Sequence, residues 1–227
     1  MMPDGENVIE QIKAHGLLPL YFHRNKETCI EIMNALYKAG VRIVEFTNRG
    51  DEALENFVAM RKLRDSEMPD LLLGAGTIKT VANAHDFIEA GADFVISPGL
   101  NEEVGKVCAT AGVFWVPGCM TPSEIMRAEA NGAKLVKLFP GNLLGPGFVD
   151  AIRELFPKLA FIPTGGVAIE TENLTAWFRS GVIGVGAGSN VINKSAVQKG
   201  DYEAIQKSIK AATKIIEQVR SSIFPNH

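Results

Sequence analysis

Hydrophobic residues gather in eight short runs along this chain, and amphipathic segments separate the runs. Short continuous apolar runs are typical of parallel strands whose faces are covered by helices. Several of them end in glycine, proline, serine or asparagine, which favour turns. The runs predict strands at 17–22, 41–48, 70–77, 93–97, 113–117, 133–141, 159–166 and 182–189.

The segments between these runs carry apolar residues at helical spacing, and most are followed by a glycine that suits a helix end. Strand and helix therefore alternate strictly, as in a chain of βα units with short loops. Eight such units in 227 residues predict a (β/α)8 barrel in one domain, 1–227. The expected helices lie at 5–15, 26–39, 51–65, 80–90, 101–111, 121–131, 146–156, 171–180 and 201–221.

Two further features complete this architecture. The segment 5–15 precedes the first strand, so we expect an additional helix that closes the bottom of the barrel. At 121–124 the sequence Thr-Pro-Ser-Glu is a strong helix start, in which Thr121 or Ser123 can cap. No GxGxxG follows the first strand, which argues against a dinucleotide-binding domain.

Composition excludes several classes of function. The net charge is −3 with scattered lysines and arginines, so neither a nucleic-acid nor a membrane partner is expected. No apolar run is long enough to span a bilayer, and the N-terminus lacks the order of a signal peptide. Three distant cysteines fit a reducing cytoplasm. The four histidines show no HxH or HExxH spacing, so we expect no metal and no cofactor.

The stretch AKLVKLFPG at 133–141 contains the first candidate for chemistry. Side chains alternate along a strand, so Leu135, Lys137 and Phe139 share one face and Lys134 belongs to the other. Burial among apolar side chains disfavours a charged ammonium, and a neutral amine is what Schiff-base chemistry requires. The alternative is a structural lysine whose ammonium reaches solvent at the strand end.

The second expected strand ends in Glu45, Thr47, Asn48 and Arg49. Period-two alternation places Glu45 and Thr47 on one face, and in a barrel that face would point inward. A buried carboxylate is costly unless it is paired, so Glu45 is expected beside Lys137 or Arg49. A purely structural Glu–Arg pair at the rim is the alternative.

Glycine-rich segments end several strands, where barrel enzymes carry their active sites. Gly165 and Gly166 follow the seventh expected strand, and Gly188 and Ser189 follow the eighth. Loops at these two positions form the recurrent phosphate site of barrels, because glycine lets backbone N–H groups surround an anion. Ordinary turn chemistry is the alternative, and the two loops together favour phosphate.

Seven motifs, in order and at matching spacing over nearly the whole chain, resemble one enzyme family. They are VEFTNR at 44–49, GAGT at 74–77, ISPG at 96–99, VPG at 116–118, KLFP at 137–140, PTGG at 163–166 and GS at 188–189. This pattern resembles the 2-keto-3-deoxy-6-phosphogluconate (KDPG) aldolases, also called 4-hydroxy-2-oxoglutarate (KHG) aldolases. The resemblance implies a class I, metal-independent pyruvate aldolase on a (β/α)8 barrel, usually a homotrimer.

The resemblance also implies roles for individual residues. Lys137 corresponds to the Schiff-base lysine and Glu45 to the general acid/base. Arg49 and Thr77 would hold the pyruvate carboxylate, and Thr164 would contact the hydroxyl-bearing chain of the substrate. The remaining implied residues are Pro98 and Phe139 in the pocket lining and Gly165, Gly166, Gly188 and Ser189 around the phosphate.

Three positions depart from the commoner family pattern. Phe22 stands where many members have an arginine after the first strand, so one anion contact is missing there. Asn48 precedes Arg49 where an apolar residue is usual, and Gly141 follows KLFP where alanine is usual. These changes border the expected pocket, so they bear on the choice of substrate more than on the reaction.

The implied reaction is cleavage of a 2-keto-4-hydroxy acid in the cytoplasm. The substrate would be KDPG, giving pyruvate and glyceraldehyde 3-phosphate as in the Entner–Doudoroff pathway, or KHG, giving pyruvate and glyoxylate. The C4-epimeric galactonate substrate is a further alternative within the family. An epimerase or isomerase of phosphorylated sugars, or a non-catalytic sugar-phosphate-binding barrel, would share the anion loops without needing Lys137 as a nucleophile.

Overall fold

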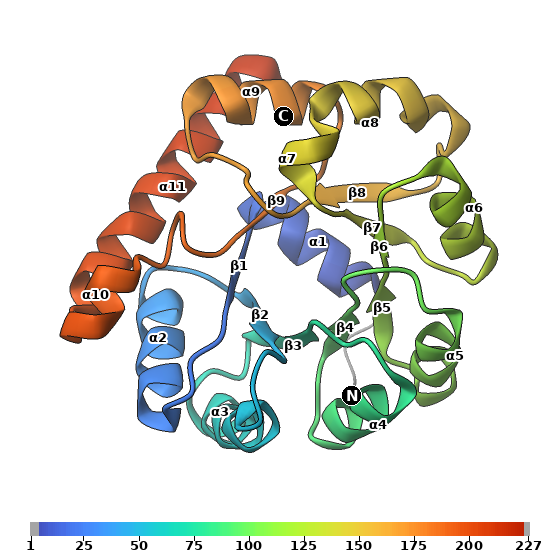
Figure 1. Cartoon of the computed structure of the whole chain (residues 1–227). Helices are drawn as coiled ribbons and strands as arrows, with labels where there is room; N and C mark the ends of the chain where they lie inside the picture. The colour runs from blue at the N-terminus through green and yellow to red at the C-terminus, as the bar shows by residue number, and fades with distance from the viewer. Residues whose placement is uncertain (1–4, 225–227) are drawn as a thin grey trace.

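The computed structural model describes residues 5–224, in which parallel strands form a curled sheet with helices outside it (Figure 1). Every strand pairing among these residues is parallel. The strands are β1 Leu17–Tyr21, β2 Ile43–Thr47, β3 Leu72–Gly76, β4 Phe94–Ile96, β5 Phe114–Val116, β6 Gly118–Cys119, β7 Leu135–Leu138, β8 Ala160–Pro163 and β9 Val185–Ala187.

The strands lie in two hydrogen-bonded groups. One has the order β5-β4-β3-β2-β1-β9 and the other the order β6-β7-β8. The groups meet where the backbone N–H of Lys137 donates to the carbonyl of Pro117 at 2.9 Å. A parallel bridge between Thr164 and Gly186 joins the end of β8 to β9. The expected alternation of strands and helices in a mixed α/β domain is thus confirmed.

The outer layer consists of the helices between the strands, and Figure 1 shows them around the periphery. Thr121 caps α6 in a capping box with Glu124, as the sequence predicts. The helices are α1 Gly5–His15, α2 Lys26–Lys38, α3 Ala53–Glu67, α4 Val81–Glu89, α5 Glu102–Ala111, α6 Pro122–Ala130, α7 Gly141–Leu144, α8 Pro146–Ile152, α9 Thr171–Arg179, α10 Lys194–Lys199 and α11 Tyr202–Ile223, with a 3₁₀ turn η1 at Arg153–Leu155.

Helix α1 lies across the amino ends of the strands. Its Val8 and Ile12 are fully buried in an inner apolar cluster with residues that begin strands, such as Ile43, Phe94 and Leu135. A larger cluster fills the space between the strands and the outer helices. Apolar side chains fill the interior at the amino ends of the strands. Polar side chains that point inward therefore lie at the carboxyl ends.

The boundaries differ from the expected ones in a few places. The fifth expected strand, 113–117, is β5, and a further short strand that was not expected, β6, begins after Pro117, which has no N–H to donate to a ladder. The last expected strand, 182–189, is limited to β9 because the chain turns at Gly188, whose carbonyl accepts from the N–H groups of Val191 and Ile192. The sequence analysis missed α7 and α10, which are only one to two turns long.

Candidate active site

A buried ion pair lies at the carboxyl ends of the strands. Lys137 Nζ on β7 is 3.3 Å from Glu45 Oε1 on β2, and the two side chains are 6% and 0% exposed. The two residues are far apart in sequence, and both point inward as their strand alternation predicts. Glu45 therefore pairs with Lys137 rather than with Arg49, which is exposed. Lys134 is exposed on the opposite face of the strand, also as predicted.

The neighbouring strand makes room for the Glu45 carboxylate. A Cβ atom on Gly76 in β3 would overlap Glu45 Oε1 and would stand 2.5 Å from its Cγ. Only glycine at position 76 therefore leaves the carboxylate where it can meet Lys137. Gly76 belongs to the GAGT motif at 74–77, and its neighbour in the structure is a side chain of the site itself.

The ring of Phe139 lies beside the lysine. Lys137 Nζ is 5.6 Å from the centroid of this ring, within the range of a cation–π contact. The same ring packs against the loop after β8, where a Cβ on Gly165 would stand 3.2 Å from it. Phe139 therefore connects the ion pair to the first of the two glycine loops.

Two buried oxygen atoms in this region accept or donate no hydrogen bond within the described residues, namely Glu45 Oε2 and Thr164 Oγ1. An unpaired buried polar atom is costly, so its presence indicates a function such as ligand binding. Thr164 follows β8, and its hydroxyl occupies the space that a side chain on Gly186 would fill. The carboxylate oxygen and the hydroxyl thus keep hydrogen-bonding capacity that no described residue uses.

Thr77 directly follows β3 and has φ 60°, the only described non-glycine residue with a positive φ. This conformation is strained for a β-branched side chain and is often found at functional sites. Thr77 is half-buried, at the same end of the sheet as Glu45. Thr77 is also the residue to which the family resemblance assigns a contact with the substrate carboxylate.

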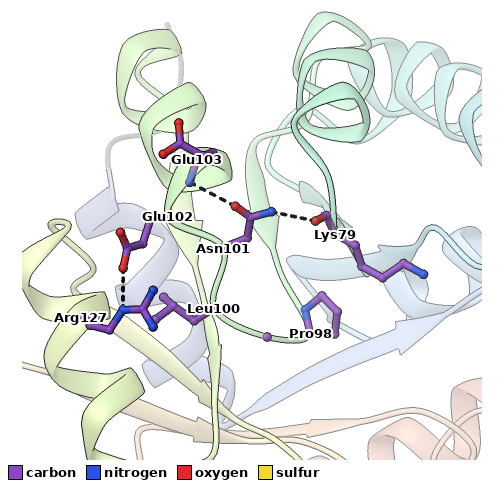
Figure 2. A pocket seen from close by; sticks show the side chains of 8 residues that line it. Lys79, Pro98, Leu100, Asn101, Glu102, Glu103 and Arg127 are labelled. Carbon is purple, nitrogen blue, oxygen red and sulfur yellow. Dashed lines mark hydrogen bonds and ion pairs between the residues drawn. The ribbon is translucent and has the colours of Figure 1, made fainter.

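Pro98 follows β4 and borders a cavity of about 520 Å³ that opens between α5 and α6. Figure 2 shows Pro98 at the edge of this cavity, with Asn101 joining the N–H of Glu103 to the carbonyl of Lys79. On the opposite wall, Arg127 pairs with Glu102. The wall of this cavity thus carries as many negatively charged side chains as positively charged ones.

The two glycine loops are neighbours. The side-chain amide of Asn190 donates to the carbonyl of Val167 at 2.6 Å, which ties the loop after β9 to the loop after β8. Gly165 and Gly166 have φ values of 93° and 72°, which favour glycine strongly. Gly188 and Ser189 lie on the other loop, at the point where β9 ends. The four residues expected around a phosphate are therefore at one end of adjacent strands.

Arg49 lines a second cavity, of about 460 Å³, together with Gly188 and Ser189. Phe22 lines the same cavity; its ring is 5.8 Å from that of Phe46 and stands 2.6 Å from where a Cβ of Gly50 would lie. The position that carries arginine in many family members is thus occupied by a packed aromatic ring. Arg49 and the loop after β9 share one space, whereas the sequence analysis assigned them to opposite ends of the substrate.

Two titratable groups near the site are kept neutral. Burial raises the pKa of the Cys119 thiol to about 12, and this residue packs in the core as a small apolar side chain. Burial also raises the pKa of Tyr21 well above its usual range, and its hydroxyl donates to the carbonyl of Cys29 at 2.7 Å. Neither group can serve as a base near neutral pH.

Across residues 5–224, no three His, Cys, Asp or Glu side chains converge in a way that could hold a metal ion. No helix in the same range combines the length and hydrophobicity needed to cross a membrane.

The buried pair of an ammonium and a carboxylate lies at the carboxyl ends of parallel strands, where α/β enzymes of this kind carry their active sites. Residues 8–208 match the family described as "KDPG and KHG aldolase". The chain belongs to this family and is an aldolase, a lyase.

Characterised relatives agree with this assignment. The chain is 32% identical to a 2-dehydro-3-deoxy-phosphogluconate aldolase of Treponema pallidum, over 87% of this chain and 92% of the relative. It is 32% identical to the KHG/KDPG aldolase of Escherichia coli K12, over 93% and 97%. A crystal structure of KDPG aldolase from Legionella pneumophila, which holds pyruvate as a covalent carbinolamine, matches with a TM-score of 0.81 and 28% identity over 90% of this chain and 97% of that one.

Proposed function

We propose that this chain is a class I aldolase that cleaves KDPG or KHG through a Schiff base on Lys137. The observation that carries the proposal is the buried pair of Lys137 Nζ and Glu45 Oε1 at 3.3 Å. Attack on a ketone needs an uncharged amine, and a carboxylate at this distance can take the proton from the lysine. Family membership and the covalent pyruvate adduct of the Legionella relative support the same chemistry.

The first half of the reaction forms the iminium ion. Glu45 takes a proton from Lys137, and the free amine attacks the C2 ketone of the substrate. A proton moves from the nitrogen to the oxygen, which gives a carbinolamine. Glu45 returns its proton to the carbinolamine hydroxyl, so that water leaves and the C2 carbon becomes an iminium.

The second half breaks the carbon–carbon bond. Glu45 takes the proton of the C4 hydroxyl, and the electrons of the C3–C4 bond flow into the iminium, so an aldehyde departs and an enamine of pyruvate remains. Glu45 then protonates C3 of the enamine. Hydrolysis of the resulting iminium releases pyruvate and restores the ammonium of Lys137.

The other residues bind and orient the substrate. Thr77 holds the carboxylate of the pyruvate half, and Arg49 reaches toward it from the cavity that Gly188 and Ser189 also line. The buried hydroxyl of Thr164 contacts the hydroxyl-bearing chain. Pro98 and Phe139 line the pocket. The phosphate, in substrates that carry one, is surrounded by the backbone of Gly165, Gly166, Gly188 and Ser189, supported by the hydrogen bond that joins their loops.

The direct test is reduction with borohydride in the presence of pyruvate. The reductant should fix a pyruvate adduct on Lys137, add the corresponding mass and inactivate the enzyme irreversibly. Peptide mapping should locate the adduct on the fragment with Lys137 and not on Lys134. Adduct formation on another lysine, or none at all, would remove the basis of the proposal.

The same assay distinguishes the remaining functions. An isomerase or a non-catalytic barrel would bind sugar phosphates without forming the adduct. A panel of KDPG, its C4 epimer and KHG, measured by coupled pyruvate release, would rank the substrates. We place KDPG and KHG first because the relatives that match at 32% identity carry those names.

We also propose that the strands form a closed barrel. The bridge between Thr164 and Gly186 and the bond from Lys137 to Pro117 support a closed (β/α)8 barrel over the full chain, 1–227, with α1 as the cap.

We further propose a cytoplasmic homotrimer. Three free, buried thiols are compatible with a reducing compartment. Light scattering should give three times the chain mass of 24.5 kDa.

A further inference from the structure

The cavity lined by Arg49 is basic in character. Its wall includes Arg49, His23 and Lys194, and none of the described residues that line it is an aspartate or a glutamate. Cationic side chains that converge without a carboxylate to neutralise them favour an anionic ligand. The cavity beside Pro98 is the opposite case, because there Glu102 and Glu103 accompany Lys79 and Arg127.

Lys194 borders this cavity with an exposed side chain, and the turn that follows Ser189 sets the place of its backbone. The carbonyl of Gly188 accepts the N–H groups of Val191 and Ile192, and both of these side chains are buried. Asn193 then caps α10, its side-chain oxygen accepting the N–H of Ser195 at 2.8 Å. The backbone of Lys194 is therefore fixed at the first position of α10, a few residues after the loop that our proposal assigns to phosphate.

Phe22, which directly follows β1, adds no charge to this cavity. Phe22 is packed against the ring of Phe46, so an apolar ring faces the space that Lys194 and Ser189 border. An anion in this cavity would therefore meet the positive charges of Arg49 and of Lys194 at the start of α10. Lys194 is the one of these that directly follows the turn of the phosphate loop, and a flexible ammonium can reach a phosphate as a point charge.

We propose that Lys194 is a specificity-determining residue that binds the terminal phosphate of the substrate and selects phosphorylated 2-keto-4-hydroxy acids over uncharged-tail analogues. This inference rests on the proposed aldolase function and deepens it. The backbone N–H groups of the loop recognise the shape of the phosphate, and Lys194 supplies the positive charge. Neither the family motifs nor the sequence analysis includes this residue.

The test compares Lys194→Ala with Lys194→Arg and with the control Lys199→Ala, an exposed lysine of the same helix that does not line the cavity. Each variant is assayed by pyruvate release on KDPG and on the same keto acid without phosphate. Inhibition by inorganic phosphate is measured in parallel, together with borohydride trapping of pyruvate.

We expect Lys194→Ala to lower kcat/KM on KDPG about five- to tenfold more than on the unphosphorylated acid, mainly through KM. Inhibition by inorganic phosphate should weaken by a similar factor, and Lys194→Arg should restore most of both effects. Lys199→Ala should match the unmodified enzyme. Trapping with pyruvate should proceed in all variants, since pyruvate has no phosphate.

Equal losses on both substrates, or no loss on KDPG, would overturn the role of Lys194 while leaving the aldolase proposal intact. An unmodified enzyme that shows no preference for the phosphorylated substrate would overturn it as well. Absence of a trapped pyruvate adduct in the unmodified enzyme would instead refute the aldolase function itself. The two failures therefore give different results.

Discussion

Two ion pairs at the same end of the sheet differ in what surrounds them. Lys137 and Glu45 lie 3.3 Å apart with side-chain exposures of 6% and 0%. Arg127 and Glu102 are closer, at 2.7 Å, but their side chains are 64% and 31% exposed. The shorter pair, Arg127 and Glu102, is therefore the one that water screens, and exposed ion pairs contribute little to the stability of the fold.

The comparison shows that burial, rather than proximity, makes an ion pair chemically useful. Both members of the inner pair have lost their hydration, so each is sensitive to a proton transfer or to a substrate that replaces its partner. Glu45 also keeps a second oxygen without a hydrogen bond in the described residues. The outer pair can be removed without exposing an uncompensated charge to an apolar interior.

Loss of the lysine should have the largest effect. Lys137→Ala removes the amine that forms the Schiff base, so kcat should fall by about 10⁴-fold or more. The measurement is pyruvate release under saturating substrate, with borohydride trapping as a second readout. Lys134→Ala is the matched control, because Lys134 is exposed on the other face of the same stretch and should keep full activity. A normal turnover rate in Lys137→Ala would contradict the mechanism.

Glu45→Gln should come next. The amide keeps the shape of the side chain but cannot accept the proton of the C4 hydroxyl, so kcat should fall about 10²- to 10⁴-fold with a small change in KM. Urea unfolding should accompany the kinetics, because Lys137 would remain buried without its charge partner. A kcat within twofold of the unmodified enzyme would exclude Glu45 as the acid/base.

A smaller loss is expected from Gly76→Ala. The added Cβ would overlap Glu45 Oε1, so the carboxylate must move away from Lys137. A displacement of about 1 Å at a reacting group costs up to about 100-fold in rate, so we expect a 10- to 100-fold loss of kcat. Gly147→Ala is the control, since nothing lies within 4 Å of its added Cβ. An unchanged kcat would mean that Glu45 is positioned by other contacts.

Sequence patterns predicted the strand–helix alternation because each strand is a continuous apolar run that period and length can identify. They also predicted which residues share a face with Lys137 and which share a face with Glu45, since alternation along a strand is a local property. The partner of Glu45 could not be chosen between Lys137 and Arg49, because that choice depends on the packing of β2 against distant β7. The space that Gly76 leaves for the Glu45 side chain could not be predicted either, because it depends on how β3 lies beside β2.

Short elements escaped the sequence analysis for a different reason. Helix α10 has only six residues, and periodicity needs a longer segment to be visible. Its caps were present, however: Asn193 accepts backbone N–H groups at the start, and Gly200 has φ 66° at the end. Reading these two residues as caps would have predicted α10 and placed Lys194 beside the loop after β9.

The smallest effect should follow from breaking the outer pair. Arg127→Ala should lower the free energy of unfolding by less than about 1 kcal/mol, because the lost pair is exposed and screened. Pyruvate release should stay within about twofold of the unmodified enzyme. Urea unfolding and the coupled assay check both values. Glu102→Gln should behave the same way, since it breaks the pair from the other side. A large kinetic loss in either variant would show that the cavity of Figure 2 takes part in substrate binding. The exposed pair beside Pro98 would then contribute to catalysis together with the buried pair of Lys137 and Glu45.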